Sequence, residues 1–142
     1  MRVADILTAS PITVGLDDSL ASIKRIFDSH AFHHVLVVGD GELFGVISDR
    51  DVLRAVSPFV DSPNERTIDS ATMKRHAHQI MSRKPITITT DQPVELAARR
   101  MLEAKVSCLP VLDDHGQVIG IVTWHDLLRA LCGLPTSAGN SA

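Results

Sequence analysis

Two short stretches of the sequence each end in a hydroxyl residue that is followed, three residues later, by an aspartate. Residues 45–51 read Gly-Val-Ile-Ser-Asp-Arg-Asp, and residues 120–126 read Gly-Ile-Val-Thr-Trp-His-Asp. A hydroxyl and a carboxylate at this spacing cap a helix, because both accept hydrogen bonds from the free N–H groups of its first turn. The same turn can also offer its hydroxyl and N–H groups to a phosphate and its carboxylate to a vicinal diol such as ribose. The spacing therefore predicts a helix start, and it is also compatible with a nucleotide contact.

The two stretches belong to a longer internal repeat. The triplet Pro11-Ile12-Thr13 recurs 74 residues later as Pro85-Ile86-Thr87. With one extra residue allowed at His115, the glycine-to-aspartate stretch and the Leu-Arg-Ala that follows it also recur. Identical residues concentrate in the turns and in this stretch, where the backbone shape is most demanding. This pattern indicates a duplication.

Each copy predicts the order strand, helix, strand, strand, helix. A short leading helix is expected over 3–7 and 77–81, extended segments over 12–14 and 86–88, and hairpins over 35–48 and 109–123. Closing helices are expected over 49–56 and 124–131. The sequence therefore predicts an α/β (α+β) fold with repeats at 3–57 and 77–132, an exposed linker at 58–76 and a tail without order at 133–142. Because about 60 residues bury too little surface alone, we expect the repeats to pack sheet to sheet about a pseudo-twofold axis.

Composition narrows the classes of function. The formal net charge of −3 and the four Phe, one Trp and no Tyr argue against a nucleic-acid or membrane surface. Apolar runs fall far short of the ~20 residues that span a bilayer, and the first residues lack the apolar stretch of a secretion signal. Cys108 and Cys132 have no metal or redox spacing, so we expect buried, reduced thiols in a cytoplasmic protein.

The duplicated unit resembles a tandem pair of CBS domains, also called a Bateman module, over residues 3 to 132. Within that family, Ser-Asp-Arg-Asp-Val-Leu at 48–53 and the polar linker are similar to stand-alone acetoin-utilisation accessory proteins. The resemblance implies a regulatory module without enzyme activity. It would bind an adenine nucleotide (AMP, ADP or ATP) or S-adenosylmethionine non-covalently and change its inter-repeat geometry to signal to an unknown partner protein.

The resemblance also implies two composite clefts, in which the motif of one repeat faces the first strand, and the segment before the second strand, of the other repeat. One cleft would combine Ser48, Arg50 and Asp51 with Ile86, Thr87, Val106, Ser107 and Cys108. The other would combine Thr123, His125 and Asp126 with Ile12, Thr13, Phe32, His33 and His34.

The chemistry of these residues suits the implied roles. The carboxylates of Asp51 and Asp126 can accept hydrogen bonds from both ribose hydroxyls, and the guanidinium of Arg50 can bind a phosphate. Because His125 is largely neutral at pH 7, we expect the Asp51 cleft to bind phosphorylated ligands better at that pH. The Asp126 cleft should become competitive near pH ~6, where histidines begin to carry charge.

The sequence raises three other hypotheses about function. A metal site at His30, His33 and His34 is disfavoured, because neighbouring residues on a strand point to opposite faces and no carboxylate or cysteine sits at a supporting spacing. Catalysis is disfavoured because the two aspartates lie in separate clefts and form no acid–base pair. A scaffold with empty clefts remains the alternative function. A homodimer is expected, with apolar residues of the closing helices as its surface: Val52, Leu53, Leu127, Leu128 and Leu131.

Overall fold

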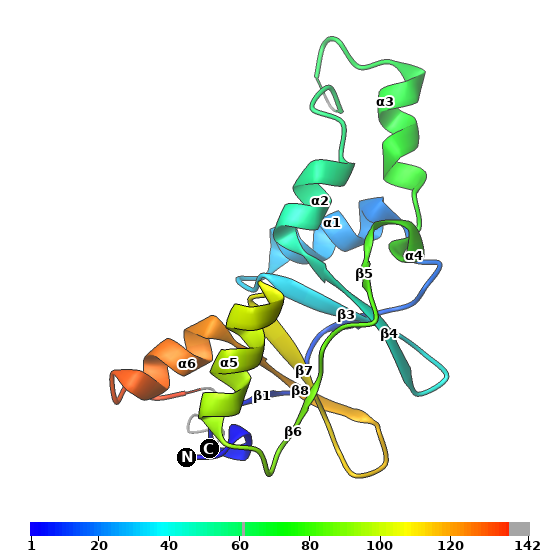
Figure 1. The fold of residues 1–142 in the computed structure, drawn as a ribbon. Coiled ribbons are helices and arrows are strands. Elements are labelled where there is room, and N and C mark those ends of the chain that lie inside the picture. The colour runs from blue at the N-terminus through cyan, green and yellow to red at the C-terminus, as the bar shows by residue number, and fades with distance from the viewer. Residues whose placement is uncertain (61, 137–142) are drawn as a thin grey trace. The chain divides into compact units, whose positions relative to one another are not determined.

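The computed structural model describes residues 1–60 and 62–136, and the chain forms two compact units (Figure 1). The first unit holds Ile12–Lys84, and the second unit combines Met1–Pro11 with the chain from Pro85 onward. Each unit contains one four-stranded sheet of mixed strand direction. The predicted α/β class and the two repeats are therefore confirmed.

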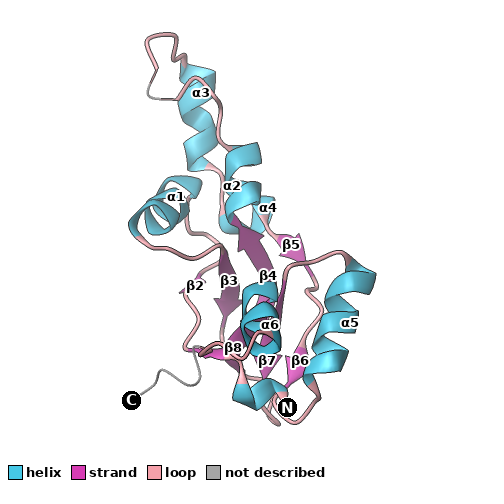
Figure 2. Cartoon of the chain, turned by 90° about the vertical axis from the view of Figure 1, so that its left-hand side faces the viewer, coloured by secondary structure: helices cyan, strands magenta, loops and turns pink. Residues whose placement is uncertain are grey.

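The first unit has a sheet with the strand order β2-β3-β4-β5. Its strands are β2 (Thr13–Val14), β3 (His34–Gly39), β4 (Glu42–Ser48) and β5 (Ser82–Arg83). Strands β2 and β3 run parallel, so the chain needs a crossover between them, which α1 (Leu20–Ser29) supplies. The closing helix α2 (Asp49–Ala55) begins directly after β4 (Figure 2).

The second unit repeats this pattern with the strand order β1-β8-β7-β6. Its strands are β1 (Thr8–Ala9), β6 (Ile88–Thr89), β7 (Cys108–Leu112) and β8 (Val118–Thr123). Its helices are the single 3-10 turn η1 (Val3–Asp5), α5 (Val94–Ala104) and α6 (Trp124–Leu131). The chain crosses over through α5 between the parallel strands β6 and β7, as it does through α1 in the first unit.

Each unit has its own hydrophobic core, formed by its crossover helix and its β-hairpin. In the first unit, Leu20 and Ile23 of α1 pack with Val35, Val37 and Ile47 of the hairpin, and all five are fully buried. The second core is built in the same way, from the buried residues Ala97, Met101, Leu109, Val111 and Val122. The three-to-four spacing of apolar residues in α1 and α5 therefore reflects one buried helix face.

The leading segment of each repeat belongs to the unit of the other repeat. Strand β1 pairs with β8, and β5 pairs with β4, in both cases antiparallel. A Cβ atom at Gly45 would lie 2.7 Å from the carbonyl oxygen of Ser82, and one at Gly120 would lie 2.8 Å from that of Thr8. Glycine recurs at the head of both motifs because the neighbouring strand approaches too closely for a side chain.

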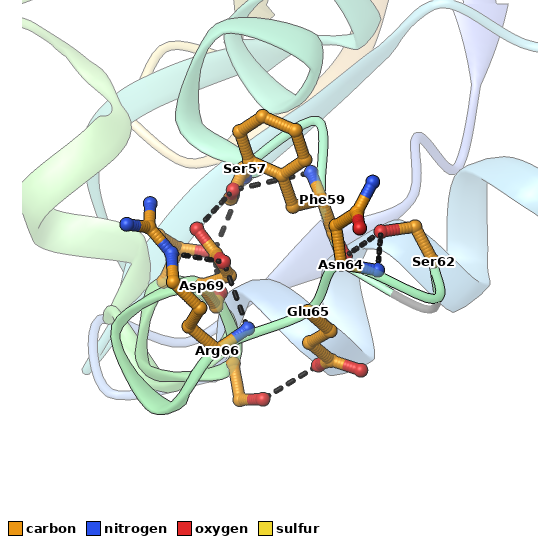
Figure 3. A network of polar contacts seen from close by, with 9 residues as sticks. Ser57, Phe59, Ser62, Asn64, Glu65, Arg66 and Asp69 are labelled. Atoms are coloured by element: carbon orange, nitrogen blue, oxygen red, sulfur yellow. Dashed lines mark hydrogen bonds and ion pairs between the residues drawn. The ribbon is translucent and has the colours of Figure 1, made fainter.

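The linker between the repeats is folded around a buried carboxylate. It contains α3 (Thr67–Ala71), the 3-10 turn η2 (Thr72–Lys74) and, after these, the leading helix α4 (Ala77–Ile80). Asp69 is 4% exposed. The Ser57 hydroxyl donates to Asp69 Oδ1 at 2.8 Å and the Arg66 N–H donates to Asp69 Oδ2 at 2.9 Å (Figure 3). The linker was expected to be exposed with some helix near its end, and α3 and η2 lie there. Asp69 is buried instead, because Ser57 at the end of the first repeat and Arg66 of the linker both donate to its carboxylate.

Several other expectations need correction at their boundaries. The helix expected over 49–56 ends at Ala55, the leading helix expected over 3–7 is only the turn η1, and the extended segment expected over 86–88 forms its strand at Ile88–Thr89. The strands β1 and β5 are additional to the predicted pattern. Cys108 is buried as expected, whereas Cys132 is exposed because it follows the end of α6. Most of the tail expected to lack order, residues 137–142, lies outside the described residues.

Among residues 1–60 and 62–136, no helix combines the length and apolar character needed to cross a bilayer. The same residues hold no group of three or more side chains arranged as metal ligands.

Candidate functional site

The two hydroxyl–aspartate motifs form matching turns between a strand and a helix. Ser48 ends β4 and caps α2: its Oγ accepts the Asp51 N–H at 3.1 Å, while Asp51 Oδ2 accepts the Ser48 N–H at 2.8 Å. Thr123 ends β8 and caps α6 in the same way, at 3.4 and 2.8 Å. The prediction that both motifs start helices is confirmed, and each turn is a reciprocal capping box.

Capping uses only one oxygen of each carboxylate. Within the described part of the chain, every hydrogen bond to Asp51 or Asp126 ends on Oδ2, and Oδ1 accepts none. No buried side-chain oxygen among these residues lacks a partner, so Oδ1 of Asp126 reaches solvent although the residue is 4% exposed. Helix capping and ligand binding are therefore compatible in the same residue, because each role needs a different carboxylate oxygen.

In the first unit, the segment before β3 lies against the motif turn. His34 pairs with Ser48 across β3 and β4, and the Asp49 N–H donates to the His33 carbonyl at 3.0 Å. The side chains of His33 and Asp49 also meet, with Nδ1 and Oδ2 2.9 Å apart. The start of β3 and the end of β4 thus bring two predicted site residues, His33 and His34, beside Ser48.

Strand β2 adds Ile12 and Thr13 to the first unit's group. The Ile12 carbonyl accepts the Leu36 N–H at 3.0 Å, and Thr13 pairs with Leu36 in the parallel ladder. Thr13 is exposed, whereas Ile12 packs partly against the core. Phe32 also packs against this core, with its ring 5.5 Å from that of Phe27.

The second unit holds the equivalent group. Cys108 pairs with Thr123 across β7 and β8, and the Trp124 N–H donates to the Ser107 carbonyl at 3.1 Å. Before β6, Ile86 is exposed, and the Thr87 carbonyl accepts a hydrogen bond from Arg100 Nη1 at 2.7 Å. Val106 and Ser107 are exposed just before β7. Burial raises the pKa of the Cys108 thiol to about 12, so this group is a neutral packing residue rather than a nucleophile.

The structure therefore groups the predicted site residues by unit. The first unit gathers Ile12, Thr13, Phe32, His33, His34, Ser48, Arg50 and Asp51. The second gathers Ile86, Thr87, Val106, Ser107, Cys108, Thr123, His125 and Asp126. In each unit, the motif turn adjoins the segment before the hairpin of its own repeat. The pairing of a motif with the strand of the other repeat stays a prediction.

The two groups differ in electrostatics. Asp51 is half-buried, whereas Asp126 is buried. Burial raises the pKa of Asp126, although the Thr123 N–H and hydroxyl oppose this shift by donating to its carboxylate. Position 50 is an exposed arginine, and its counterpart His125 has its ring 4.0 Å from the Trp124 ring.

Asp49, the first residue of α2, was not identified as a site residue from the sequence. Burial alone would raise the pKa of Asp49, but the hydrogen bonds from His33 and from the Arg50 N–H outweigh it and lower that pKa. Its partner lies 16 residues upstream. Only the antiparallel pairing of β3 and β4 brings the two side chains together, so no local signal could have found this hydrogen bond.

Comparisons with known proteins agree with this architecture. A model of the CBS domain matches residues 3–58 and 77–133. A CBS domain-containing protein of Dictyostelium discoideum is 37% identical over 131 residues, which cover 91% of this chain and 90% of that protein.

Solved structures are similar over nearly the whole chain. The CBS domain pair of protein MJ0100, in complex with 5′-methylthioadenosine and S-adenosyl-L-methionine, is 32% identical, with a TM-score of 0.77 over 94% of this chain and 97% of that one. CBSX2 in complex with AMP is 27% identical, with a TM-score of 0.76 over 93% and 96%. An acetoin utilization protein from Vibrio cholerae shares the fold at 22% identity, with a TM-score of 0.75 over 94% and 91%.

Proposed function

The chain belongs to the CBS-domain family, and from this premise we propose that it is a non-catalytic, cytoplasmic regulatory module that binds an adenosine-containing ligand. The observation that carries the proposal is the pair of motif turns. Each turn holds an aspartate by one carboxylate oxygen and leaves Oδ1 without a partner among the described residues. A carboxylate fixed in this way can accept hydrogen bonds from a ribose diol without losing its helix cap.

The surrounding residues suit the rest of such a ligand. The exposed apolar side chain of Ile86 lies just before β6, and the partly buried Ile12 lies just before β2, where they could contact a flat base. Arg50 is exposed one residue before Asp51 and carries a permanent charge for a phosphate. Related CBS pairs bind 5′-methylthioadenosine, S-adenosylmethionine or AMP, which all contain adenosine.

Regulation would follow from a difference in affinity. A ligand that binds one arrangement of the two repeats better than another shifts the population toward that arrangement. A partner protein that recognises the same arrangement would then respond to the ligand. The module itself needs no acid–base pair, and the neutral Cys108 thiol and the capping role of both aspartates suit binding rather than catalysis.

The experiment is a thermal-unfolding panel with AMP, ADP, ATP, S-adenosylmethionine and 5′-methylthioadenosine on the wild type. A ligand at 100 times its dissociation constant adds ~2.7 kcal/mol to the free energy of unfolding. Asp51→Ala and Asp126→Ala should reduce the stabilisation, whereas Asp114→Ala, an exposed aspartate of the β7–β8 turn, should not. An unchanged melting temperature with all five ligands would contradict the proposal.

The scaffold alternative is favoured by a different observation, an apolar groove of about 720 Å³ in the second unit. It lies between α5 and α6 and is lined by exposed apolar side chains that include Leu102, Leu128 and Leu131. In the first unit, Leu53 of α2 is 77% exposed. Val52 and Leu127 pack against the cores, so the expected dimer surface is narrower than the sequence indicated.

We propose that this groove packs against a second copy of the chain, because an apolar face of this size is costly in water. Light scattering coupled to gel filtration should give the mass of a dimer for the wild type. Leu131→Asp should give the mass of a monomer, and Arg129→Asp, an exposed neighbour outside the groove, should stay dimeric. A monomeric wild type would contradict this part of the proposal.

A further inference from the structure

The first unit contains a second, smaller pocket beside its motif turn. Its volume is about 210 Å³, and it is lined by Asp51, Arg54, Ala55, Arg75, Gln79 and Ile80. The first three residues belong to α2, and Gln79 and Ile80 belong to α4, which packs against α2 (Figure 2). All six lie within Ile12–Lys84, so the pocket is formed by the first unit alone.

The chemistry of this pocket favours an anion. Two guanidinium groups, those of Arg54 and Arg75, line it with a single carboxylate, so the side chains carry a net positive charge. Guanidinium groups stay protonated at all physiological pH values and present paired N–H donors that match phosphate oxygens. Arg75 Nη2 donates to the Gln79 carbonyl at 3.3 Å, which orients this side chain along α4.

The carboxylate of Asp51 gives the pocket a second binding preference, for hydroxyl groups. A phosphate would avoid this carboxylate, because two negative charges repel each other at short distance. Hydroxyl groups would instead favour it, since Asp51 Oδ1 has no partner among the described residues. A pocket with guanidinium groups and one carboxylate therefore matches a phosphorylated sugar, with the phosphoryl group at the arginines and hydroxyls at Asp51.

The internal repeat provides a comparison for this pocket. The residues of the second repeat that correspond to Asp51 and Arg54 are Asp126 and Arg129, which keep the same charges. Arg75, however, corresponds to Met1, and Gln79 corresponds to Asp5. The second unit thus has an apolar side chain in place of a cationic one and an anionic side chain in place of a neutral one.

The corresponding side chains of the second unit are also used differently. Arg129 Nη1 donates to the Pro135 carbonyl at 3.3 Å, and Asp5 Oδ2 accepts the Arg2 N–H at 2.7 Å. Met1 lines the apolar groove together with Ala130, the counterpart of Ala55. The charge balance that favours an anion therefore exists in the first unit and is reversed in the second.

We propose that this pocket, formed by Arg54, Arg75, Gln79 and Asp51, binds the phosphoribosyl part of a phosphorylated ligand. This inference rests on the proposed function and deepens it, because it makes the first unit selective for nucleotides over uncharged or cationic adenosyl compounds. At the 5′ position, where AMP carries its phosphoryl group, S-adenosylmethionine carries a cationic sulfonium and 5′-methylthioadenosine carries a neutral thioether.

The experiment compares binding of AMP and adenosine to the full chain by isothermal titration calorimetry. Arg75→Met installs the residue that corresponds to Arg75 in the second unit, and it should weaken AMP binding about tenfold or more, as the loss of a charge-assisted hydrogen bond does. Adenosine affinity should stay unchanged. Arg54→Ala provides a second variant with the same expected result. Lys74→Met removes an equal charge one residue away from the pocket lining and should bind AMP as the wild type does.

The outcomes separate this inference from the proposed function. If wild type binds AMP and both arginine variants bind it equally well, the pocket assignment is overturned and the proposed function stands. If wild type binds no adenosine compound, the proposed function fails. Titrations with ribose 5-phosphate and inorganic phosphate then test the pocket assignment. Ribose 5-phosphate binding that is lost in Arg75→Met but kept in Lys74→Met supports a phosphorylated-sugar site. Binding of inorganic phosphate alone, or of neither probe, overturns it.

Discussion

The two motif turns have the same hydrogen bonds and different surroundings. Ser48 with Asp51 and Thr123 with Asp126 form the same reciprocal helix cap, with the backbone N–H to carboxylate distance at 2.8 Å in both. Asp126 is nevertheless buried with a raised pKa, whereas Asp51 is half-buried in a pocket with two arginines. Duplication has thus preserved the local geometry of the turn, while the residues packed around it have changed its electrostatics.

The largest expected effect tests whether both turns depend on a close strand neighbour. Gly45→Ala and Gly120→Ala should each lower the free energy of unfolding by about 1–3 kcal/mol, because the new Cβ overlaps a backbone carbonyl that cannot move easily. Urea unfolding measures this. Gly116→Ala, at a positive φ of 78° with no atom within 4 Å of the added Cβ, serves as control and should cost about 1 kcal/mol. A Gly45→Ala protein as stable as wild type would contradict the close approach.

The second effect concerns the ligand. Asp51→Ala should weaken AMP binding by about 10- to 100-fold, the loss of one or two hydrogen bonds to a charged group. Asp126→Ala should weaken it less at neutral pH, because its turn carries neither Arg50 nor the pair Arg54 and Arg75. Calorimetric titration of both variants measures the difference. Equal losses would remove the electrostatic distinction between the two turns.

A smaller effect distinguishes the two caps. Ser48→Ala should cost about 1 kcal/mol of stability, because the Asp51 N–H loses its acceptor. Thr123→Ala should cost somewhat more, within about 2 kcal/mol, because the Thr123 hydroxyl also donates to Asp126 Oδ2 at 3.1 Å. Thermal unfolding measures both, and Thr123→Ser, which keeps the hydroxyl, should recover most of the loss. A Ser48→Ala protein that is the less stable of the two would contradict this order.

The smallest effect is a difference in pH dependence between the two buried aspartates. Burial raises the pKa of Asp126, so the folded state takes up a proton before the unfolded state does as the pH falls. Wild type should therefore gain stability relative to Asp126→Asn as the pH falls from neutral toward the ordinary aspartate pKa of ~3.9. Urea unfolding over this range measures the change.

Asp69 provides the control of opposite sign. The hydrogen bond from Ser57 and that from the Arg66 N–H outweigh burial and lower its pKa. Its stabilising contribution is therefore present above the unfolded pKa and is lost as the pH falls through the lower, folded value. Wild type should lose stability relative to Asp69→Asn in the acid range. The same direction for both variants would show that the burial of Asp126 is not the cause.

The helix caps and the order of elements were predictable because their signals are local. The boundaries of α6 coincide with the predicted residues 124–131, and β8 ends at Thr123, the predicted end of the second hairpin. Strands β1 and β5 have only two residues each, and no run of apolar residues indicates them. Each forms because a strand that is distant in the sequence, β8 for β1 and β4 for β5, has an edge with which it can pair. Local β-propensity carries no information about such an edge.

The other features that the sequence did not predict depend on contacts between residues far apart in it. The hydrogen bond between His33 and Asp49 and the burial of Asp69 under Ser57 depend on contacts between residues 16 and 12 positions apart. The pocket of Arg54 and Arg75 depends on two helices from different repeats that pack within one unit.

The sequence by itself determined the duplication, the α/β class, the two capping turns and the aspartates that they hold. These features follow from the spacing of a few residues, which acts through hydrogen bonds within one helical turn. Only the tertiary structure decided that the leading segment of each repeat joins the unit of the other, and that Asp51 and Asp126 differ in burial and neighbouring charge. Burial and electrostatics depend on which side chains the fold brings together, and local spacing does not carry that information.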